Sequence, residues 1–268
     1  NVGLDVTVNN ALLACEYNAR ADIPVLAGSA KPLVRPVRSA SNIHGKSGLG
    51  ASLELYAEGT PSDKNGAEFI IEQAKAHAGK LEILSLGPLT DVALALEKAP
   101  EIAKAIACIT IMGGGIHAGN ATKYAEFNIV ADPEAASVVF SSGVKTVMIG
   151  LDATNLCYQP RSDIELLCAP TELGKIVPAM LSSYADVYKQ VHNIDGMMIH
   201  DAICAVYLWR PELFTCMKCR MTVCLEDGEH LGQTIPEDGD TCLAATSCDA
   251  QAVRNELLAV MQQVVAAH

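Results

Sequence analysis

The stretch ITIMGGGIHAGNATKYAEFNIVADPEAA, residues 109–136, decides the fold that this sequence predicts. It begins as a short apolar strand, stops at three consecutive glycines and resumes as a helix at Asp132-Pro133. An aspartate followed by proline at the first helical position is a common helix start. A strand, a glycine-rich loop and a helix in this order indicate an open parallel α/β sheet, in which ligands bind beyond the carboxyl ends of the strands.

The loop of this stretch carries side chains suited to a sugar. Gly113 to Gly115 let the backbone approach a ligand closely, because glycine has no Cβ. Asn120, Glu126 and Asn128 follow, and amide and carboxylate groups form paired hydrogen bonds to neighbouring hydroxyls. The loop lacks the Gly-Lys-Ser/Thr ending of a phosphate-binding loop. We therefore expect a sugar-hydroxyl site, with a merely solvated loop as the alternative.

Outward from this stretch, strands and helices alternate along the chain. The expected strands are residues 23–27, 81–86, 108–112 and 144–149, and the expected helices are 6–19, 67–78, 90–98, 132–141, 178–191, 199–208 and 250–267. A hairpin is expected around Asp227-Gly228. The alternation implies right-handed crossovers and a mainly parallel sheet. We predict a single α/β domain over residues 1–268.

Composition and charge narrow the functional classes. Half of the residues are hydrophobic, the formal net charge is −12, and no apolar run reaches the roughly 18 residues that span a bilayer. The acidic balance argues against a nucleic-acid or anionic-membrane surface, and it suits a small neutral ligand or a site that collects a cation. The first residues lack the basic-then-apolar pattern of a signal peptide, so we expect a soluble, cytoplasmic protein.

The ten cysteines lie mostly within predicted strands and helices, so we expect small buried residues in a reducing compartment. Cys216, Cys219 and Cys224 include a C-x-x-C spacing. No second such pair or histidine pair completes a zinc set, unless Cys242 or Cys248 joins in space. We interpret the cluster as structural, with metal binding or redox chemistry as the alternative.

Two other predicted elements carry polar residues at their ends. Thr90 and Asp91 follow the strand 81–86, and a helix cap explains both. His200 and Asp201 stand at the start of the helix 199–208. A carboxylate suits Ca²⁺ or Mg²⁺, and an imidazole suits proton transfer near neutral pH. The pair is either a cap with a satisfied histidine or a metal ligand beside a proton donor.

Aromatic and histidine side chains complete the candidate site. Tyr184 and Tyr188 stand four apart on one helix face, either as packing residues or as an aromatic wall that stacks on a flat base. His44 lies in the glycine-rich loop 39–50 and is a candidate lid residue.

Taken together, these residues resemble the inosine-uridine-preferring nucleoside hydrolases, the N-ribohydrolase family. The resemblance covers nearly the whole chain, in NIHGKSGLG (42–50), GPLTD (87–91), IMGG, GN and AEFNIVADPEAA (between 111 and 136), GLDATN (150–155) and IHDAICAVY (199–207). AEFN-x-x-x-DPEAA with a downstream His-Asp is its most specific part. It implies a Rossmann-like, mostly parallel open sheet with helices on both faces and an active site at the strand carboxyl ends.

The resemblance implies hydrolysis of the N-glycosidic bond of a ribonucleoside to a free base and ribose. It implies a small-molecule nucleoside as substrate and a homodimer or homotetramer. It also implies a bound Ca²⁺ ligated by the carboxylate of Asp201 and the backbone carbonyl of Thr90, with His200 assisting the departing base. In this resemblance the ribose hydroxyls are bound by Asn1, Asn120, Glu126 and Asn128, and Met112 lines the sugar pocket. Phe127, Tyr184 and Tyr188 line the base side, and His44 lies on the mobile loop.

One departure from the family pattern concerns catalysis. The family begins with a strand and an aspartate-rich D-x-D-P-G-x-D-D loop that supplies most calcium carboxylates and the general base, whereas this sequence opens at Asn1. The resemblance therefore implies that the first strand and helix are missing. We expect an N-terminally incomplete form of a normal enzyme, because loss of a central strand would expose sheet edges. The 268-residue polypeptide alone is expected to bind calcium weakly and to hydrolyse nucleosides negligibly.

Two other functional classes compete with this interpretation. A catalytically inactive ribose- or nucleoside-binding protein would keep the hydroxyl-binding residues and lack the base, and binding without product would identify it. A nucleotide-binding oxidoreductase is disfavoured, because Gly113–Gly115 does not follow the G-x-G-x-x-G spacing.

Overall fold

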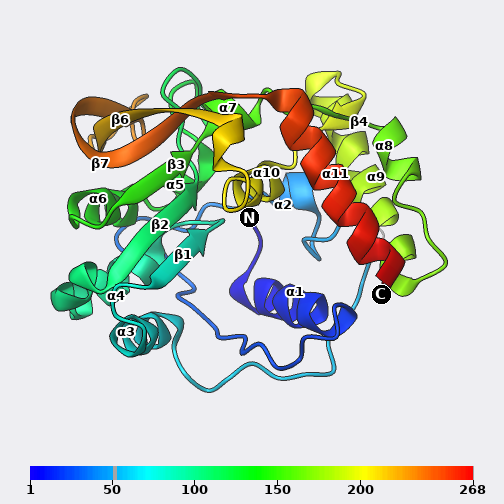
Figure 1. The fold of residues 1–268 in the computed structure, drawn as a ribbon, viewed down its shortest axis with the longest axis horizontal. Helices are drawn as coiled ribbons and strands as arrows, with labels where there is room; N and C mark the ends of the chain where they lie inside the picture. The colour runs from blue at the N-terminus through cyan, green and yellow to red at the C-terminus, as the bar shows by residue number, and fades with distance from the viewer. Residues whose placement is uncertain (51–52, 268) are drawn as a thin grey trace.

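A central five-stranded sheet organises the computed structural model, which describes residues 1–50 and 53–267 (Figure 1). The strands lie in the order β1 (Leu81–Ser85), β2 (Ile106–Met112), β3 (Thr146–Ile149), β7 (Thr234–Cys248) and β6 (Phe214–Val223). The first four strands run parallel to one another, and β6 runs antiparallel to β7. The prediction of a mostly parallel α/β sheet is confirmed.

Helices lie on both faces of this sheet, as predicted (Figure 1). The longer helices are α1 (Leu4–Tyr17), α3 (Gly66–Ala76), α4 (Thr90–Lys98), α6 (Pro133–Ser141), α9 (Glu172–His192), α10 (His200–Val206) and α11 (Ala250–Ala267). The short helices are α2 (Ser41–His44), α5 (Phe127–Ala131), α7 (Leu151–Thr154) and α8 (Ser162–Glu165), and β4 (Gln159–Pro160) pairs with β5 (Gly196–Met197) as a separate two-stranded sheet.

The core is divided by the sheet into two main clusters, because successive strand side chains point to opposite faces. Ile109 and Ile111 of β2 pack with α3, α4 and α6 on one face. Val147 and Ile149 of β3 pack with α7, α10 and α11 on the other. A third cluster joins α8, α9 and the end of α11, shown together at the right of Figure 1. The sheet is thereby held rigidly beneath the loops at its carboxyl edge.

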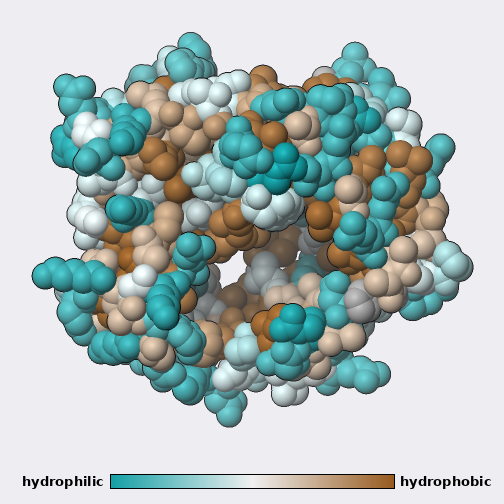
Figure 2. All heavy atoms as spheres, in the orientation of Figure 1, coloured by the Kyte–Doolittle hydropathy of each residue, from teal (hydrophilic) through white to brown (hydrophobic). Residues whose placement is uncertain are grey.

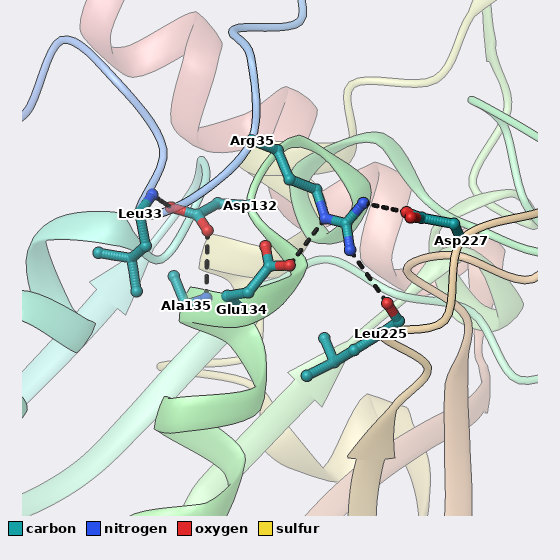
Figure 3. A network of polar contacts seen from close by, with 7 residues as sticks. All are labelled: Leu33, Arg35, Asp132, Glu134, Ala135, Leu225 and Asp227. Atoms are coloured by element: carbon teal, nitrogen blue, oxygen red, sulfur yellow. Dashed lines mark hydrogen bonds and ion pairs between the residues drawn. The ribbon is translucent and has the colours of Figure 1, made fainter.

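Polar contacts, more than regular elements, attach the segment 18–65 to this core (Figure 3). The Leu33 N–H donates to Asp132 Oδ2 at 2.9 Å. The Arg35 guanidinium reaches Glu134 Oε1 at 2.7 Å and Asp227 Oδ1 at 2.5 Å. One short stretch of chain thus contacts the start of α6 and the β6–β7 hairpin at once.

Several expected elements differ from the structure. The predicted strand 23–27 is wrong: this part of the chain forms only an isolated bridge, Leu26 to Ser62. Pro24 lacks the N–H that a strand ladder needs, which explains why the apolar run does not pair. The hairpin around Asp227-Gly228 is confirmed but longer than predicted, because β6 and β7 extend through residues 214–248. The helix expected at 178–191 begins earlier, at Glu172, and accommodates Pro178 in its interior.

The strand β1 forms one edge of the described sheet and pairs with β2. Figure 2 shows an opening in the middle of this face of the molecule, partly rimmed by hydrophobic residues and lying between α1 and β1 in this view. Among the described residues, none of the helices combines the length and hydrophobicity that crossing a membrane requires.

Candidate active site

A cavity of about 830 Å³ lies at the carboxyl ends of β1 and β2. Its walls come from residue 1, the segment 40–50, the ends of both strands, the loop 119–128, and the helices α9 and α10. The lining residues that were predicted from sequence are Asn1, His44, Met112, Asn120, Glu126, Phe127, Asn128, Tyr184, Tyr188, His200 and Asp201. Side chains as distant in sequence as Asn1 and Asp201 therefore meet at one site.

One wall of the cavity presents a carboxylate and two amides in fixed orientations. The Glu126 side chain caps α5 and accepts hydrogen bonds from Gly114 N–H at 3.1 Å and Ile129 N–H at 3.2 Å. Asn128 Nδ2 donates to the Met112 carbonyl at 3.0 Å. These backbone contacts hold the side chains of the predicted sugar site without a ligand, which favours tight recognition of hydroxyls.

The protonation of Glu126 is balanced near neutral pH. The side chain is 2% exposed, and this burial raises its pKa to about 7. Hydrogen bonds from the backbone N–H groups oppose the shift, because they stabilise the charged form. Positive charge developing on a bound sugar would favour the carboxylate form of this group.

In the glycine run before this wall, the backbone conformation and the close neighbours of Gly114 require a residue without a Cβ. Gly114 has a φ of +74°, which residues with a Cβ rarely adopt, and a Cβ there would lie 2.7 Å from Met148 Sδ. Thr234, at the start of β7, exchanges two hydrogen bonds with the backbone of Gly115, accepting at 3.1 Å and donating at 3.0 Å. The loop is therefore anchored to the sheet on both sides of the Glu126 contact.

The opposite wall is a chain of hydrogen-bonding and stacked rings. His200 Nε2 lies 3.3 Å from the Tyr188 hydroxyl, and the Tyr184 hydroxyl donates to that of Tyr188 at 3.4 Å. The His44 ring stacks on Tyr184 with centroids 5.6 Å apart and planes at 18°. Burial lowers the pKa of His44 and raises the pKa of both tyrosines, so these groups are uncharged near neutral pH. An uncharged aromatic wall suits a flat heterocyclic base.

His200 is held by a residue that was not singled out from the sequence. Its Nδ1 lies 2.8 Å from the hydroxyl of Thr154, a fully buried residue at the end of α7. Burial lowers the pKa of His200 to about 4, so the ring is neutral at pH 7 and carries one N–H. If the Thr154 hydroxyl donates to Nδ1, the proton resides on Nε2, on the cavity side. The signal in the sequence was the stretch GLDATN (150–155), which contains Thr154 and follows the strand β3.

The structure does not bring Thr90 to the cavity. Its hydroxyl donates to Asp132 Oδ2 at 2.7 Å within the core, at the first residue of α4. The expected side-chain cap of α4 is also wrong, because the N-cap is Leu89 and Asp91 instead accepts the Ser29 N–H at 2.9 Å. Leu86, which follows β1, lines the cavity in place of Thr90. A backbone ligand leaves no mark on residue type, so the metal-ligand role that the resemblance gives to Thr90 stays a prediction.

Asp201 gives the cavity a carboxylate for a cation. Asp201 has solvent-exposed surface, but the surrounding protein partly desolvates its carboxylate. This desolvation raises the pKa of Asp201 to about 6. A bound cation would stabilise the charged form. Calcium takes roughly six to eight oxygen ligands, and the described residues contain no cluster of three or more His, Cys, Asp or Glu side chains arranged to hold a metal. The described side chains alone therefore do not complete a site of this kind.

Comparison with known proteins agrees with this geometry. The profile of the family described as inosine-uridine preferring nucleoside hydrolase matches residues 1–256. The non-specific ribonucleoside hydrolase RihC of Escherichia coli (strain SMS-3-5 / SECEC) is 36% identical over 244 residues, covering 91% of this chain and 78% of the relative. RihC of Klebsiella pneumoniae is 35% identical over 235 residues, covering 88% of this chain and 76% of the relative.

Solved structures of similar proteins share the whole architecture. The purine-preferring ribonucleoside hydrolase from Gardnerella vaginalis superposes with a TM-score of 0.94 at 26% identity, covering all of this chain and 90% of that one. A plant nucleoside hydrolase, PpNRh1, gives a TM-score of 0.90 at 29% identity, covering 99% of this chain and 87% of that one.

Proposed function

This chain belongs to the inosine-uridine preferring nucleoside hydrolase family, and from that membership we propose how its cavity serves the family reaction. The protein is a hydrolase of N-glycosyl compounds that cleaves ribonucleosides into a free base and ribose. The cavity supplies two unlike walls, one polar and one aromatic, for the two unlike halves of such a substrate.

The ribose lies against Asn120, Glu126 and Asn128 in this proposal, with Met112 beside the sugar and Asn1 reaching a hydroxyl. The observation that carries it is Glu126, a buried carboxylate fixed by two backbone N–H groups at the cavity wall. Cleavage of a glycosidic bond passes through an oxocarbenium-like state. A fixed negative charge beside the sugar stabilises that state more than the ground state, which is the requirement for catalysis.

The base lies against Tyr184 and Tyr188, with Phe127 and His44 closing the site. His200 is neutral at pH 7, so it assists the departing base as a hydrogen-bond donor through Nε2, with the Tyr188 hydroxyl as its neighbour. Hydrogen bonding to the leaving group makes the base a better leaving group, a contribution of about 10²–10⁴-fold for general acid catalysis. Thr154 holds the ring that makes this contact.

The family is one of metal-dependent hydrolases, and we propose Ca²⁺ as the metal. The carboxylate of Asp201 would hold it, with the backbone carbonyl of Leu86 as the second candidate ligand, since both residues line the cavity. When bound, such an ion orients hydroxyls and lowers the pKa of its water. The described residues supply too few carboxylates around Asp201 for a complete site, so we expect the 268-residue polypeptide, made alone, to bind calcium weakly and to turn over nucleosides negligibly.

Calorimetry beside a product assay tests both parts of the proposal. The 268-residue polypeptide is titrated with ribose, inosine and uridine, with and without Ca²⁺, while release of free base is followed by chromatography. Binding with negligible product is the expected result, and it would also describe the alternative, a nucleoside-binding protein. Release of base at a rate typical of an efficient hydrolase would contradict the expected inactivity. If none of the three ligands binds, the assignment of the sugar and base walls is contradicted.

The remaining parts of the proposal concern the assembly and its surroundings. We expect a homodimer or homotetramer in the cytoplasm. Sedimentation velocity on the purified polypeptide measures the first, and fractionation of the source cells measures the second.

A further inference from the structure

Two cysteines far apart in sequence meet behind the active site. Cys157 follows α7, and Cys248 is the last residue of β7. Their Sγ atoms are 3.3 Å apart, and both lie near the carbonyl oxygen of Ala153, at 3.9 Å for Cys157 and 3.4 Å for Cys248. A disulfide requires about 2.05 Å between the sulfurs, so an approach of about 1.2 Å would join them. Neither cysteine lines the cavity.

We propose that Cys157 and Cys248 form an oxidisable dithiol that a hydroperoxide converts to a disulfide. The Cys248 thiolate attacks one peroxide oxygen and the O–O bond breaks, which gives a sulfenic acid and hydroxide; the hydroxide takes up the proton that the Cys248 thiol released and becomes water. Cys157 then attacks the Cys248 sulfur, the S–O bond breaks, and the released hydroxide takes the Cys157 proton. Two thiols and one hydrogen peroxide thus become one disulfide and two waters.

The two thiols differ in ways that assign these roles. Cys248 is partly exposed, whereas Cys157 is 1% exposed, so a small peroxide reaches Cys248 first. The hydrogen bond from Cys157 lowers the pKa of Cys248, and the same contact raises the pKa of Cys157. A more acidic, more accessible thiol beside a buried partner is the arrangement of an attacking cysteine and its resolving cysteine.

A second cysteine pair, which lies within the central sheet, provides a matched control. Cys219 on β6 lies directly opposite Cys242 on β7, and each is 1% exposed. Burial raises the pKa of both, that of Cys242 to about 12. These thiols are near each other but have neither access nor acidity, so we expect them to stay reduced under conditions that oxidise Cys157 and Cys248.

Peptide mapping of the oxidised polypeptide tests the proposal. The folded 268-residue chain is treated with a small excess of hydrogen peroxide, remaining thiols are alkylated, and the digest is analysed by mass spectrometry. We expect loss of two hydrogens in a cross-linked peptide containing Cys157 and Cys248, with Cys219 and Cys242 alkylated after unfolding. A cross-link that closes so long a loop should also raise the Tm by roughly 5–10 °C, reversed by reductant.

Single variants separate the two steps. Cys157→Ser should leave Cys248 as a sulfenic acid that dimedone traps, and Cys248→Ser should leave Cys157 unoxidised. The proposal is overturned if Cys157 and Cys248 of the wild-type chain are both recovered as alkylated thiols while other cysteines oxidise. It is also overturned if Cys219 and Cys242 cross-link first. These readouts need no turnover, so they stand apart from the nucleoside assays.

Discussion

Thr154 shows how a single buried hydroxyl sets the chemistry of the active site. The His200 ring is neutral, and a neutral imidazole has one donor and one acceptor nitrogen. If the Thr154 hydroxyl donates across the 2.8 Å contact to Nδ1, the proton lies on Nε2, which faces the cavity as the donor. Thr154 is therefore a positioning residue that acts through His200.

Replacing Thr154 by the isosteric valine tests this role. Thr154→Val removes the hydroxyl while keeping the volume, so the Nε2–H form of His200 should lose its preference, and stability should fall by about 1 kcal/mol. ¹⁵N NMR of the imidazole reports which nitrogen is protonated. Thr154→Ser keeps the hydroxyl and should keep the wild-type spectrum. An unchanged His200 signal in Thr154→Val would contradict the assignment.

Glu126 makes a contribution to stability that depends on pH. Its pKa is about 7 in the folded chain and near 4.5 when unfolded, so between these values the native state holds a proton that the unfolded state has lost. The stabilisation is present below about pH 4.5 and is lost as pH rises through 7, by about 3 kcal/mol at most. Urea unfolding at pH 5 and pH 8 with a chelator measures it.

Glu126→Gln is the matched variant for this measurement, because glutamine keeps the shape and does not titrate. The fall in stability from pH 5 to pH 8 should be smaller in Glu126→Gln than in the wild-type chain. Glu58→Gln, at an exposed position, should behave as the wild type. Equal pH dependence in wild type and Glu126→Gln would show that the carboxyl is ionised throughout.

At the scale of elements, Asp132 joins three parts of the fold. It is fully buried and accepts hydrogen bonds from Ala135 N–H at 3.1 Å, Leu33 N–H at 2.9 Å and the Thr90 hydroxyl at 2.7 Å. One carboxylate thus caps α6, attaches the segment 18–65 and contacts the start of α4. Thr90 and Asp132 belong to separate sequence motifs, and the structure joins them by a hydrogen bond.

Asp132→Ala should therefore destabilise the chain and loosen a distant segment. Loss of a helix cap together with two buried partners predicts a cost of about 3 kcal/mol or more in the free energy of unfolding. Urea unfolding measures the cost, and hydrogen exchange should show reduced protection at Leu33. Asp22→Ala removes an exposed carboxylate that contacts Arg20, and it should change neither. A loss of stability with normal protection at Leu33 would contradict the attachment role.

At the scale of the whole molecule, residues from across the described chain line the cavity, and few of them are charged. Ca²⁺ at 1 mM should consequently raise the Tm by less than about 2 °C, because stabilisation by a ligand depends on its concentration relative to Kd. Asp201→Asn should abolish even this shift, while Asp195→Asn, an exposed control, should keep it. A calcium-dependent rise of 10 °C or more would mean that the described residues hold the ion more completely than their arrangement indicates.

The sequence allowed most of the sheet and most helices to be predicted from local patterns, and the family resemblance added cavity residues such as Asn1, Met112 and Phe127. The run of Gly113–Gly115 marks a strand end, and the residues after it share one loop. Thr154 and the Cys157–Cys248 pair could not be predicted, since each contact joins segments that only the finished fold brings together. The strand 23–27 failed for a local reason, the proline within it, and the metal-ligand role of Thr90 stays a prediction, because a backbone carbonyl carries no residue signature.

The attachment of the segment 18–65 has a consequence for synthesis on the ribosome. Some of its hydrogen bonds go to α1, which precedes it, but the anchors Asp91, Asp132, Glu134 and Asp227 all follow it in the chain, and the last lies in the C-terminal quarter. The emerging segment can contact α1 early, but its hydrogen bonds to α6 and to the β6–β7 hairpin form only after those elements have been made. During that interval the segment lacks these later anchors and is open to chaperones and proteases, so we expect the order of translation to influence how it folds.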